Sequence, residues 1–330
     1  MQLLMTAAAL DRVRDRIAPF AGGLDIVTTS KEDGFRRDGR PVEASEVDPD
    51  IVWATLDSMA DGQLNVLISR TLKGTRARWM QTFNAGLDAP IFREIMAKGI
   101  RISKSNAQAV PIAEFVVGHA ISLILPIDRQ REAQAAHEWR RTPYREVSQI
   151  HWTLIGYGSI GREIAKRVKA FGARVTVVRR SVGSDDLVDA VVAQDALPQV
   201  LPTTDVVVLA CALTEETRNL AGQAFFDALK PGAILVNIGR GDLVDEDALR
   251  AGLERDQPGH AVLDVFRTEP LPADSWFWDH PKVRVAAHTS NSGYGTPGRG
   301  DDLFVANLER YVKGEPLINE ASPREVGLPS

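Results

Sequence analysis

A glycine-rich turn lies between an apolar run and an amphipathic helix near the middle of the chain. Residues 152–155 are apolar, Gly156-x-Gly158-x-x-Gly161 follows at once, and apolar side chains then recur at helical spacing. In such a strand-turn-helix unit the first glycine permits the bend, the second lets a pyrophosphate approach the backbone, and the third allows helix and strand to pack closely. A lone glycine motif also marks ordinary tight turns. A second strand expected over residues 174–178 makes a dinucleotide site the better interpretation here.

Two arginines and a serine stand at the end of that second strand, at Arg179, Arg180 and Ser181. A carboxylate in this place accepts hydrogen bonds from the ribose 2′-hydroxyl of NAD and repels a 2′-phosphate, whereas guanidinium groups fork onto phosphate oxygens. We therefore predict NADP(H) as the preferred cofactor, with NAD(H) as the second choice. A solvated basic pair at a strand end is the alternative interpretation. The pyrophosphate would bind at the helix N-terminus, at Gly156, Gly158, Ser159, Ile160 and Gly161.

The bulk composition narrows the class of protein. A chain of 330 residues with 44% hydrophobic and 25% charged residues is long enough for two ordinary globular domains. Its formal net charge of -5 gives no support for nucleic acid as a partner. Cys211 is the single cysteine, which rules out an internal disulfide and fits a reducing, cytoplasmic location. No apolar run reaches the length of a membrane span, and we expect no membrane association and no secretory signal.

Strand and helix patterns alternate along the chain, which predicts an α/β protein with two doubly wound, mostly parallel sheets. Strands are expected near residues 2–5, 24–28, 50–55, 78–82 and 99–103, and again near residues 153, 175, 206, 234, 261 and 283. Helices are expected over residues 8–17 and 63–72 and near residues 160, 217 and 246. We predict a Rossmann cofactor domain at residues 109–292. A flavodoxin-like substrate domain, discontinuous in sequence, would comprise residues 1–108 and 293–330.

Two further helical segments fit this division of the chain. Residues 111–129 predict one helix, with Pro111 near its start and an apolar middle, which would bridge the two domains. A helical stripe over residues 301–311 arrives after the second sheet is complete, so it most simply returns to the first domain. Open α/β sheets bind ligands at the carboxyl ends of their strands, and a cleft between the domains is therefore the expected place for a substrate.

Three segments follow late strands and would lie near a bound nicotinamide. They read VNIGRGD at residues 236–242, LDVFRTEPLP at 263–272 and VAAHTS at 285–290. Together with the glycine motif, and in this order, they resemble the D-isomer-specific 2-hydroxy acid dehydrogenase family. QTFNAGLD at residues 81–88 is similar to the family's substrate loop. Ala287 stands where the family usually has proline, and Ser290 begins a polar stretch in place of small apolar and glycine residues, so the chain departs from the family near the substrate pocket.

Reduction of a 2-keto acid needs a cation for the carboxylate, a proton donor for the carbonyl oxygen, and a hydride placed over the carbonyl carbon. The resemblance implies that Arg240, Glu269 and His288 form the catalytic group. The guanidinium of Arg240 suits carboxylate binding and carbonyl polarisation, and the imidazole of His288 suits proton donation. Glu269 would orient His288 and stabilise its imidazolium. Taken singly, each side chain also has an ordinary structural explanation, such as a surface ion pair or a structural histidine.

Other binding residues follow from the same resemblance. Asp264 would accept a hydrogen bond from the nicotinamide carboxamide, unless it is a buried structural aspartate. The segment beside the adenosine and phosphates would include Cys211, Leu213 and Thr217, with Ile238 on the next strand. No histidine has a metal-ligand spacing to cysteine or carboxylates, so no metal is expected. Substrate contacts would come from Arg240, His288 and the backbone of Asn84, Ala85, Gly86 and Leu87.

A small 2-keto acid with an uncharged tail is the expected substrate. Residues 55–61 face the cleft in this family and carry two acids but no base, whereas a phosphorylated substrate would require basic groups. Glyoxylate, hydroxypyruvate or a similar keto acid fits this pattern. The aromatic residues Trp276, Phe277, Trp278 and Tyr294 either wall the pocket or pack at a domain or subunit contact. Members of the family are commonly dimers, so we expect a homodimer, with residues 111–129 and 140–143 as candidate contacts.

Two other functions remain open from the sequence. One is a corepressor-like protein that binds a dinucleotide without turning anything over, and the other is a phosphite or formate dehydrogenase on the same scaffold. The first is disfavoured because all three catalytic positions are filled. The second differs only in the acid that is oxidised, so a comparison of substrates is needed to separate it from a keto acid reductase.

Overall fold

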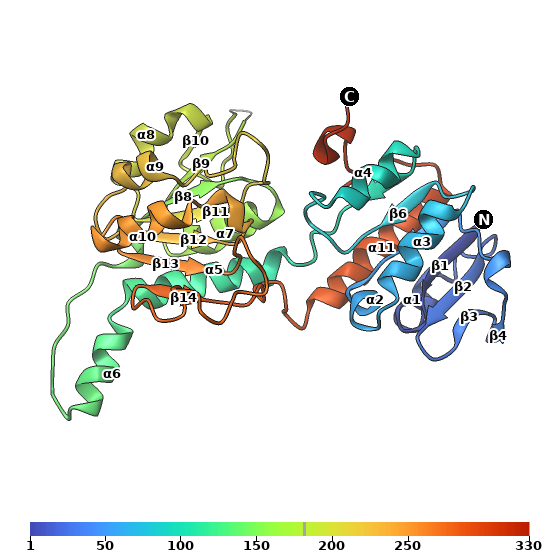
Figure 1. The fold of residues 1–330 in the computed structure, drawn as a ribbon, viewed down its shortest axis with the longest axis horizontal. Helices are drawn as coiled ribbons and strands as arrows, with labels where there is room; N and C mark the ends of the chain where they lie inside the picture. The colour runs from blue at the N-terminus through green and yellow to red at the C-terminus, as the bar shows by residue number, and fades with distance from the viewer. Residues whose placement is uncertain (181–182, 330) are drawn as a thin grey trace. The chain divides into compact units, whose positions relative to one another are not determined.

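The computed structural model describes residues 1–180 and 183–329, which form two compact units. Unit 1 comprises Met1–Gln108 and Tyr294–Ser330, and unit 2 comprises Ala109–Gly293. Each unit contains one seven-stranded sheet that is mostly parallel, with helices packed on both of its faces (Figure 1). The predicted α/β class with two doubly wound sheets is therefore confirmed.

The sheet of unit 2 is entirely parallel, and its strand order is β10-β9-β8-β11-β12-β13-β14. One line of paired residues crosses it near the carboxyl ends, from Val178 through Ile155, Leu209, Asn237 and Leu263 to Val285. The residues that follow this line share one edge of the sheet. The strands are β8 (His151–Ile155), β9 (Arg174–Val178), β10 (Ala190–Val192), β11 (Val206–Leu209), β12 (Ile234–Asn237), β13 (His260–Leu263) and β14 (Val283–Val285).

Alternating side chains of this sheet form two separate cores. In β11, for example, Val206 and Val208 face one layer of helices while Val207 and Leu209 face the other. The first layer is made by α5 (Ala109–Ile124) and α7 (Ser159–Ala170). The second is made by α8 (Leu197–Val200), α9 (Gln223–Ala228) and α10 (Glu246–Glu254). Because both faces are covered, the functional groups of unit 2 are confined to the edges and loops.

The sheet of unit 1 has the order β4-β3-β2-β1-β5-β6-β7. Its five parallel strands lie where the sequence predicts them, but an antiparallel hairpin at one edge was not predicted. The hairpin turns at Asp38 and Gly39, both with positive φ, before a strand of only two residues. The strands are β1 (Gln2–Thr6), β2 (Asp25–Ser30), β3 (Gly34–Arg37), β4 (Arg40–Pro41), β5 (Ile51–Trp53), β6 (Trp79–Gln81) and β7 (Arg101–Ser103).

Segments far apart in sequence complete unit 1. The C-terminal helix α11 (Thr296–Val312) packs beside α1 (Ala7–Ile17) on one face of the sheet, where Phe304 stacks on Trp53 at 3.8 Å between ring centroids (Figure 1). The predicted return of this helix to the first sheet is therefore confirmed. The other helices are α2 (Leu56–Ala60), α3 (Leu64–Lys73) and α4 (Pro90–Ala97). Short 3₁₀ turns lie at Ala44–Glu46, Val147–Gln149, Gln194–Ala196, Leu201–Thr203, Gly241–Leu243 and Pro323–Val326.

Two helix predictions were wrong in their extent. The single helix predicted over residues 111–129 is divided into α5 and α6 (Ile127–Ala135), which meet at a bend of 55°. Pro126 lies at the break. The helix is interrupted there because proline supplies no amide hydrogen and disfavours helical geometry in the residue before it. The helix expected near Thr217 begins only at Gln223, since the Thr217 hydroxyl donates to the carbonyl of Ala212 and holds a turn.

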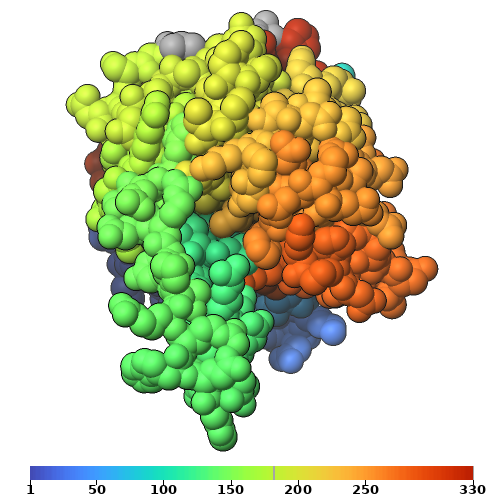
Figure 2. All heavy atoms as spheres, turned by 90° about the vertical axis from the view of Figure 1, so that its left-hand side faces the viewer, coloured from blue at the N-terminus to red at the C-terminus, as the bar shows by residue number. Residues whose placement is uncertain are grey.

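The helix α6 and residues 136–146 extend away from the body of unit 2 (Figures 1 and 2). The segment carries Trp139, whose exposed fraction is 99%, and the half-exposed Tyr144. Arg145 ends it with a two-pronged ion pair to Asp205. Across residues 1–180 and 183–329, no single helix has the length and apolar character to cross a membrane, whereas α5 and α6 reach them only as a bent pair.

At the amino ends of the unit 2 strands, Asp205 holds several segments of unit 2 together. Its carboxylate accepts hydrogen bonds from Arg145 at 2.6 and 3.1 Å, from Lys230 at 2.5 Å and from the amide of His151 at 2.9 Å. Burial alone would raise the pKa of Asp205, but these hydrogen bonds outweigh it and the pKa is lowered. The ionised carboxylate is therefore the form that stabilises the fold.

Replacing Asp205 with asparagine should lower the free energy of unfolding of unit 2 by about 2 kcal/mol at neutral pH. Because the folded pKa is lowered, the stabilisation is present above the unfolded pKa and is lost as pH falls through the folded pKa. Urea unfolding at neutral pH and at pH values below the unfolded pKa measures both effects. Asp227→Asn is the matched control, since Asp227 pairs with Arg255 on the surface, and the two variants should differ at neutral pH and converge in acid.

Candidate active site

The glycine turn after β8 has the geometry that a dinucleotide requires. Gly156 has a φ of +101°, and a Cβ there would lie 2.6 Å from the backbone of Ala210, so only glycine fits. A Cβ on Gly161 would lie 2.5 Å from the carbonyl oxygen of Gly156, whereas the position of Gly158 faces open space. No side chain caps the first turn of α7, which leaves the amides of Ser159, Ile160 and Gly161 without intrahelical acceptors. These amides fit a pyrophosphate.

Arg179, at the end of β9, lies near residues that the sequence analysis did not predict to be part of the site. Its guanidinium lies 5.9 Å from the ring centroid of Tyr157, and that of Arg162 lies 5.5 Å from the same ring. Arg162 also pairs with Asp185, one of the acids in the loop after β9. The Nε of Arg179 is buried and has no hydrogen-bond acceptor among the described residues. Arg180 is exposed beside it, and Ser181 lies outside the described residues.

The residues predicted beside the adenosine follow β11 and β12. Thr217 braces its loop, because its hydroxyl donates to the carbonyl of Ala212 and accepts from the amide of Thr214, both at 2.8 Å. Leu213 and Cys211 pack against one core of unit 2, and Ile238 is buried in the other. Burial raises the pKa of the Cys211 thiol to about 11, so it stays protonated and unreactive.

Arg240 follows β12 in a turn that packs tightly on its neighbour. A Cβ on Gly241 would lie only 2.0 Å from the carbonyl carbon of Phe266, so glycine is required for this approach. Asn237 fixes the turn, since its side chain donates to the carbonyl of Arg240 and accepts from the amide of Gly239. The guanidinium of Arg240 is half-buried and donates to the carbonyl of Gly239 at 2.8 Å. Arg240 is thereby held beside the segment that leads to Glu269.

His288 and Glu269 form a direct pair. The Nδ1 of His288 lies 2.8 Å from one carboxylate oxygen of Glu269, and the other oxygen accepts from the amide of Phe266 at 2.9 Å. A carboxylate at Nδ1 assigns the proton to that nitrogen and leaves Nε2 for proton exchange with a ligand. The side chain of His288 is 45% exposed, so a ligand can reach it.

Asp264 supports the backbone of His288. The amide of His288 donates to the carbonyl of Asp264 at 2.9 Å, and His288 has a φ of +53°, which few residues adopt. The buried carboxylate of Asp264 accepts from the amides of Thr289 and Ser290 and from the hydroxyl of Ser290. Asp264 therefore holds the turn that carries His288, and the polar Ser290 supplies one of the donors. Its predicted bond to a carboxamide stays a prediction.

In unit 1, the predicted substrate loop follows β6. Thr82 accepts a hydrogen bond from the amide of Asn84 and donates to its side chain at 2.8 Å. Among residues 1–180 and 183–329, no acceptor exists for the amides of Ala85, Gly86 and Leu87. Three successive amides without an acceptor make this loop a candidate for binding a carboxylate. The side chain of Leu87 is buried in the core of unit 1 and anchors the loop.

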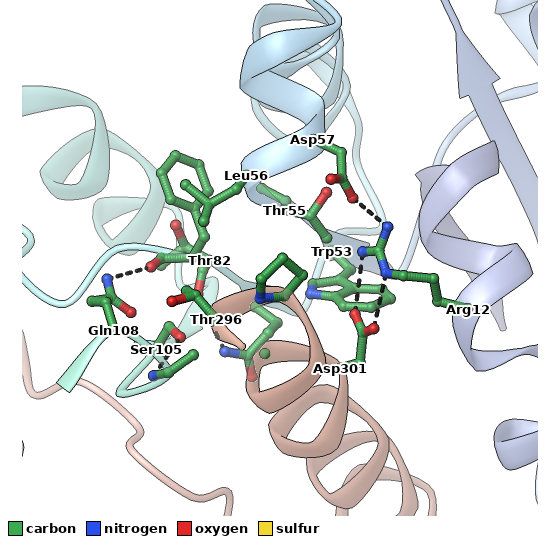
Figure 3. A pocket seen from close by; sticks show the side chains of 16 residues that line it. Arg12, Trp53, Thr55, Leu56, Asp57, Thr82, Ser105, Gln108, Thr296 and Asp301 are labelled. Atoms are coloured by element: carbon green, nitrogen blue, oxygen red, sulfur yellow. Dashed lines mark hydrogen bonds and ion pairs between the residues drawn. The ribbon is translucent and has the colours of Figure 1, made fainter. Parts of the chain in front are cut away.

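A small cavity lies beside this loop, at the carboxyl edge of the unit 1 sheet (Figure 3). Its volume of about 30 Å³ matches the space of about one water molecule. Thr82, Ser105 and Gln108 line one side. Arg12, Asp57 and Asp301 line the other as an ion-paired group. The sequence analysis noted the acids of residues 55–61 but not Arg12 or Asp301.

Two of the four aromatic residues near His288 in the sequence pack against the core of unit 2. Phe277 is buried in the core of unit 2, and Trp276 stacks on it at 4.1 Å between ring centroids. Trp278 is half-exposed and donates to the carbonyl of Pro272. Tyr294 is fully exposed and belongs to unit 1. No cluster of three or more metal-ligating side chains occurs in the described part of the chain.

The predicted residues of unit 2 thus gather at one edge of its sheet. Gly156 follows Ile155, Arg179 follows Val178, and Cys211, Ile238, Asp264 and His288 follow the other paired strand ends in turn. Unpaired helix amides, arginines and a histidine–carboxylate pair on the carboxyl edge of a parallel sheet are the arrangement of a nucleotide-dependent α/β enzyme.

Comparisons with known proteins agree with this class. The sequence profile for "D-isomer specific 2-hydroxyacid dehydrogenase, NAD binding domain" matches residues 117–290. A glyoxylate/hydroxypyruvate reductase A of Arabidopsis thaliana is 29% identical over 246 residues, 72% of this chain and 76% of that protein. A 4-methyl-2-oxopentanoate reductase A of Aspergillus oryzae is 30% identical over 273 residues, covering 78% and 77%. A D-isomer specific 2-hydroxyacid dehydrogenase of Xanthobacter autotrophicus, solved with NADPH and MES, superposes with a TM-score of 0.77 at 25% identity over 98% of both chains.

The chain therefore belongs to the D-isomer specific 2-hydroxyacid dehydrogenase family. It is an oxidoreductase that binds NAD(P) through unit 2. The family resemblance inferred from four motifs is confirmed by a match that covers more than half of the chain.

Proposed function

We propose that the protein reduces a small 2-keto acid, such as glyoxylate or hydroxypyruvate, to the 2-hydroxy acid with NADPH. The observation that supports this most is the pair between His288 and Glu269, placed on the same sheet edge as the glycine turn. The nicotinamide supplies the hydride when it is bound. His288 gives its Nε2 proton to the carbonyl oxygen, and Glu269 stabilises the imidazolium before that transfer.

The carboxylate of the substrate would be held by Arg240 and by the amides of Ala85, Gly86 and Leu87. A guanidinium binds a carboxylate through two parallel hydrogen bonds and also polarises the neighbouring carbonyl. Asp264 and Ser290 would act as positioning residues, because they fix the turn that carries His288 without reaching its ring.

The preference for NADPH rests on Arg179 and Arg180. A buried guanidinium nitrogen without an acceptor is costly, and a 2′-phosphate would satisfy the Nε of Arg179. Arg162 pairs with Asp185, which reduces the repulsion that this acid of the loop would exert on the phosphate. The NADPH complex of the Xanthobacter relative is consistent with this preference.

The proposed reaction is tested by a screen of NADPH consumption over glyoxylate, hydroxypyruvate, pyruvate, 2-ketogluconate and phenylpyruvate. We expect glyoxylate or hydroxypyruvate to give the highest kcat/KM, as the names of the Arabidopsis relative suggest. The same protein is offered NADP with formate and with phosphite. Reduction of NADP by either acid without keto acid turnover would replace the proposal with a phosphite or formate dehydrogenase. Binding of NADPH without any oxidation would replace it with a nucleotide sensor.

We also propose that the protein is a homodimer in which α5, α6 and residues 136–146 contact the partner. The full exposure of Trp139 supports this, because a tryptophan with no apolar contact is unfavourable in an isolated chain. Light scattering should give twice the chain mass of 36.1 kDa, and Trp139→Ser should shift the equilibrium toward the single chain at low concentration. A wild-type mass of one chain at high concentration would refute the dimer. The cytoplasmic location stays a prediction from the single thiol.

A further inference from the structure

The cavity of unit 1 adjoins the loop proposed to hold the substrate carboxylate. Thr82 lines the cavity (Figure 3). Its hydroxyl also donates a hydrogen bond to the side chain of Asn84 in that loop. If the carboxylate binds the amides of residues 85–87, the group attached to the keto carbon would lie near the cavity, whose volume of about 30 Å³ admits no more than about one water-sized group. The cavity therefore bears on which tail the substrate carries.

The described residues that line the cavity include only three charged side chains, and they form one cluster. Arg12 comes from α1, Asp57 from the first turn of α2 and Asp301 from α11. Figure 3 shows Arg12 between the two acids. Its Nε and Nη2 donate to Asp301 at 2.8 and 3.2 Å, and its Nη1 lies 2.5 Å from Asp57. One positive and two negative charges leave the cluster with a charge of -1.

The two acids hold Arg12 in different ways. The side chain of Asp301 is only 6% exposed and accepts two bonds from Arg12, so it is a fixed partner. The side chain of Asp57 is 30% exposed and makes one contact. Arg12 has five N–H donors, and contacts to Asp301, Asp57 and the carbonyl of Ala8 engage four of them. Burial opposes its charge, yet its pKa is raised because the hydrogen bonds to both acids outweigh burial.

We infer that Asp57 masks Arg12 and thereby restricts the enzyme to 2-keto acids with an uncharged tail. The inference rests on the proposed function. An anionic tail near the cavity would approach a cluster of net negative charge whose only cation is already occupied. A hydrogen atom or a hydroxymethyl group meets no such barrier, and a hydroxyl finds neutral polar partners in Thr82 and Gln108. The charge of one residue would thus set the class of substrate.

The test compares hydroxypyruvate with 3-phosphohydroxypyruvate, which is both more charged and larger. Because the difference in size is the same for every variant, a change in the ratio of the two activities between variants reports the charge. Asp57→Asn keeps the shape of the side chain and changes the cluster charge from -1 to zero. We expect the ratio of kcat/KM for the phosphorylated over the free acid to rise about tenfold, an effect moderated by the partial exposure of Arg12 and Asp57. Asp57→Ser should move the ratio in the same direction and serves as the second variant if the first fails to fold.

Two further variants assign the effect to Arg12. Asp61→Asn removes the same charge from a residue that is not among the described residues lining the cavity and is not an ion-pair partner of Arg12, and it should leave the ratio within about twofold of the wild type. Asp57→Asn combined with Arg12→Gln restores a cluster charge of -1 and should abolish the gain. Circular dichroism of each variant shows whether it is folded.

The outcomes separate the inference from the proposed function. A wild type that reduces hydroxypyruvate while Asp57→Asn keeps the wild-type ratio overturns the inference alone. A gain that persists in the double variant, or that appears equally in Asp61→Asn, also overturns it. A protein that reduces neither acid with NADPH overturns the proposed function, and the inference falls with it. A tenfold gain confined to the Asp57 variants supports both.

Discussion

Replacing His288 with asparagine should lower kcat for keto acid reduction by about a thousandfold, because the carbonyl oxygen loses its proton donor. The loss should appear in kcat and in kcat/KM alike, since proton donation acts in the transition state. The dissociation constant of NADPH should not change, because the glycine turn and the arginines lie on other strands. Stopped-flow turnover and fluorescence titration of NADPH measure the two quantities separately.

The control for this result is a histidine without a carboxylate partner. His280 accepts a hydrogen bond from the amide of Lys282 and lies in the same unit, so His280→Asn should keep wild-type turnover. Glu269→Gln should give an intermediate loss, because the amide still accepts a bond from Nδ1 but no longer stabilises the imidazolium. Wild-type kcat in His288→Asn would remove this residue from the role of proton donor.

The second large effect concerns the cofactor. Replacing both Arg179 and Arg180 with glutamine should weaken NADPH binding about a hundredfold and leave NADH binding nearly unchanged, since two charge-assisted contacts to the 2′-phosphate are lost. Calorimetry with 2′,5′-ADP and with 5′-AMP isolates this contact, because the two fragments differ only in the 2′-phosphate and neither carries the nicotinamide. The loss should be confined to the fragment with the 2′-phosphate and should shrink at high salt.

Arg174→Gln is the matched control for the loss of charge. Arg174 begins β9, the strand that Arg179 follows, and therefore lies at the opposite edge of the sheet. It should bind both fragments like the wild type. Equal weakening of 2′,5′-ADP and 5′-AMP in the Arg179 and Arg180 variant would mean that the arginines contact the 5′-phosphate or support the fold, and the assignment to the 2′-phosphate would be withdrawn.

The parts of this molecule that could be predicted are those that depend on short stretches of sequence. The glycine turn was predictable because strand, turn and helix are contiguous from residue 152 to residue 170. Arg240 and His288 could be placed on one edge because both follow parallel strands, and the carboxyl ends of such strands meet at the same side of a sheet. Periodicity and strand order therefore predicted most of the fold, whereas the roles expected of Arg240, Glu269 and His288 came from the family resemblance.

The features of the fold and the site that could not be predicted depend on contacts between segments that are distant in the sequence. The spacing of residues does not reveal such contacts. Arg12 and Asp301 are 289 positions apart, and nothing in either helix pattern pairs them. The contact of Arg179 with Tyr157 requires the turn and the end of β9 to approach each other in space. In the sequence, Ser290 was noted only as a departure from the family pattern. Its hydrogen bond to Asp264 depends on the fold of the turn that carries His288. Pro126 is a helix breaker that the sequence contains, but the predicted helix over residues 111–129 ran through it.

Hydride transfer from the nicotinamide to the keto carbon is the central claim, and isotope transfer tests it most directly. The protein is mixed with hydroxypyruvate and NADPH carrying deuterium at either position of nicotinamide C4, and the products are analysed by mass spectrometry and chiral chromatography. We predict D-glycerate with one deuterium at C2 from one of the two labelled cofactors and none from the other. Product without deuterium from both cofactors, or no glycerate at all, would contradict the account.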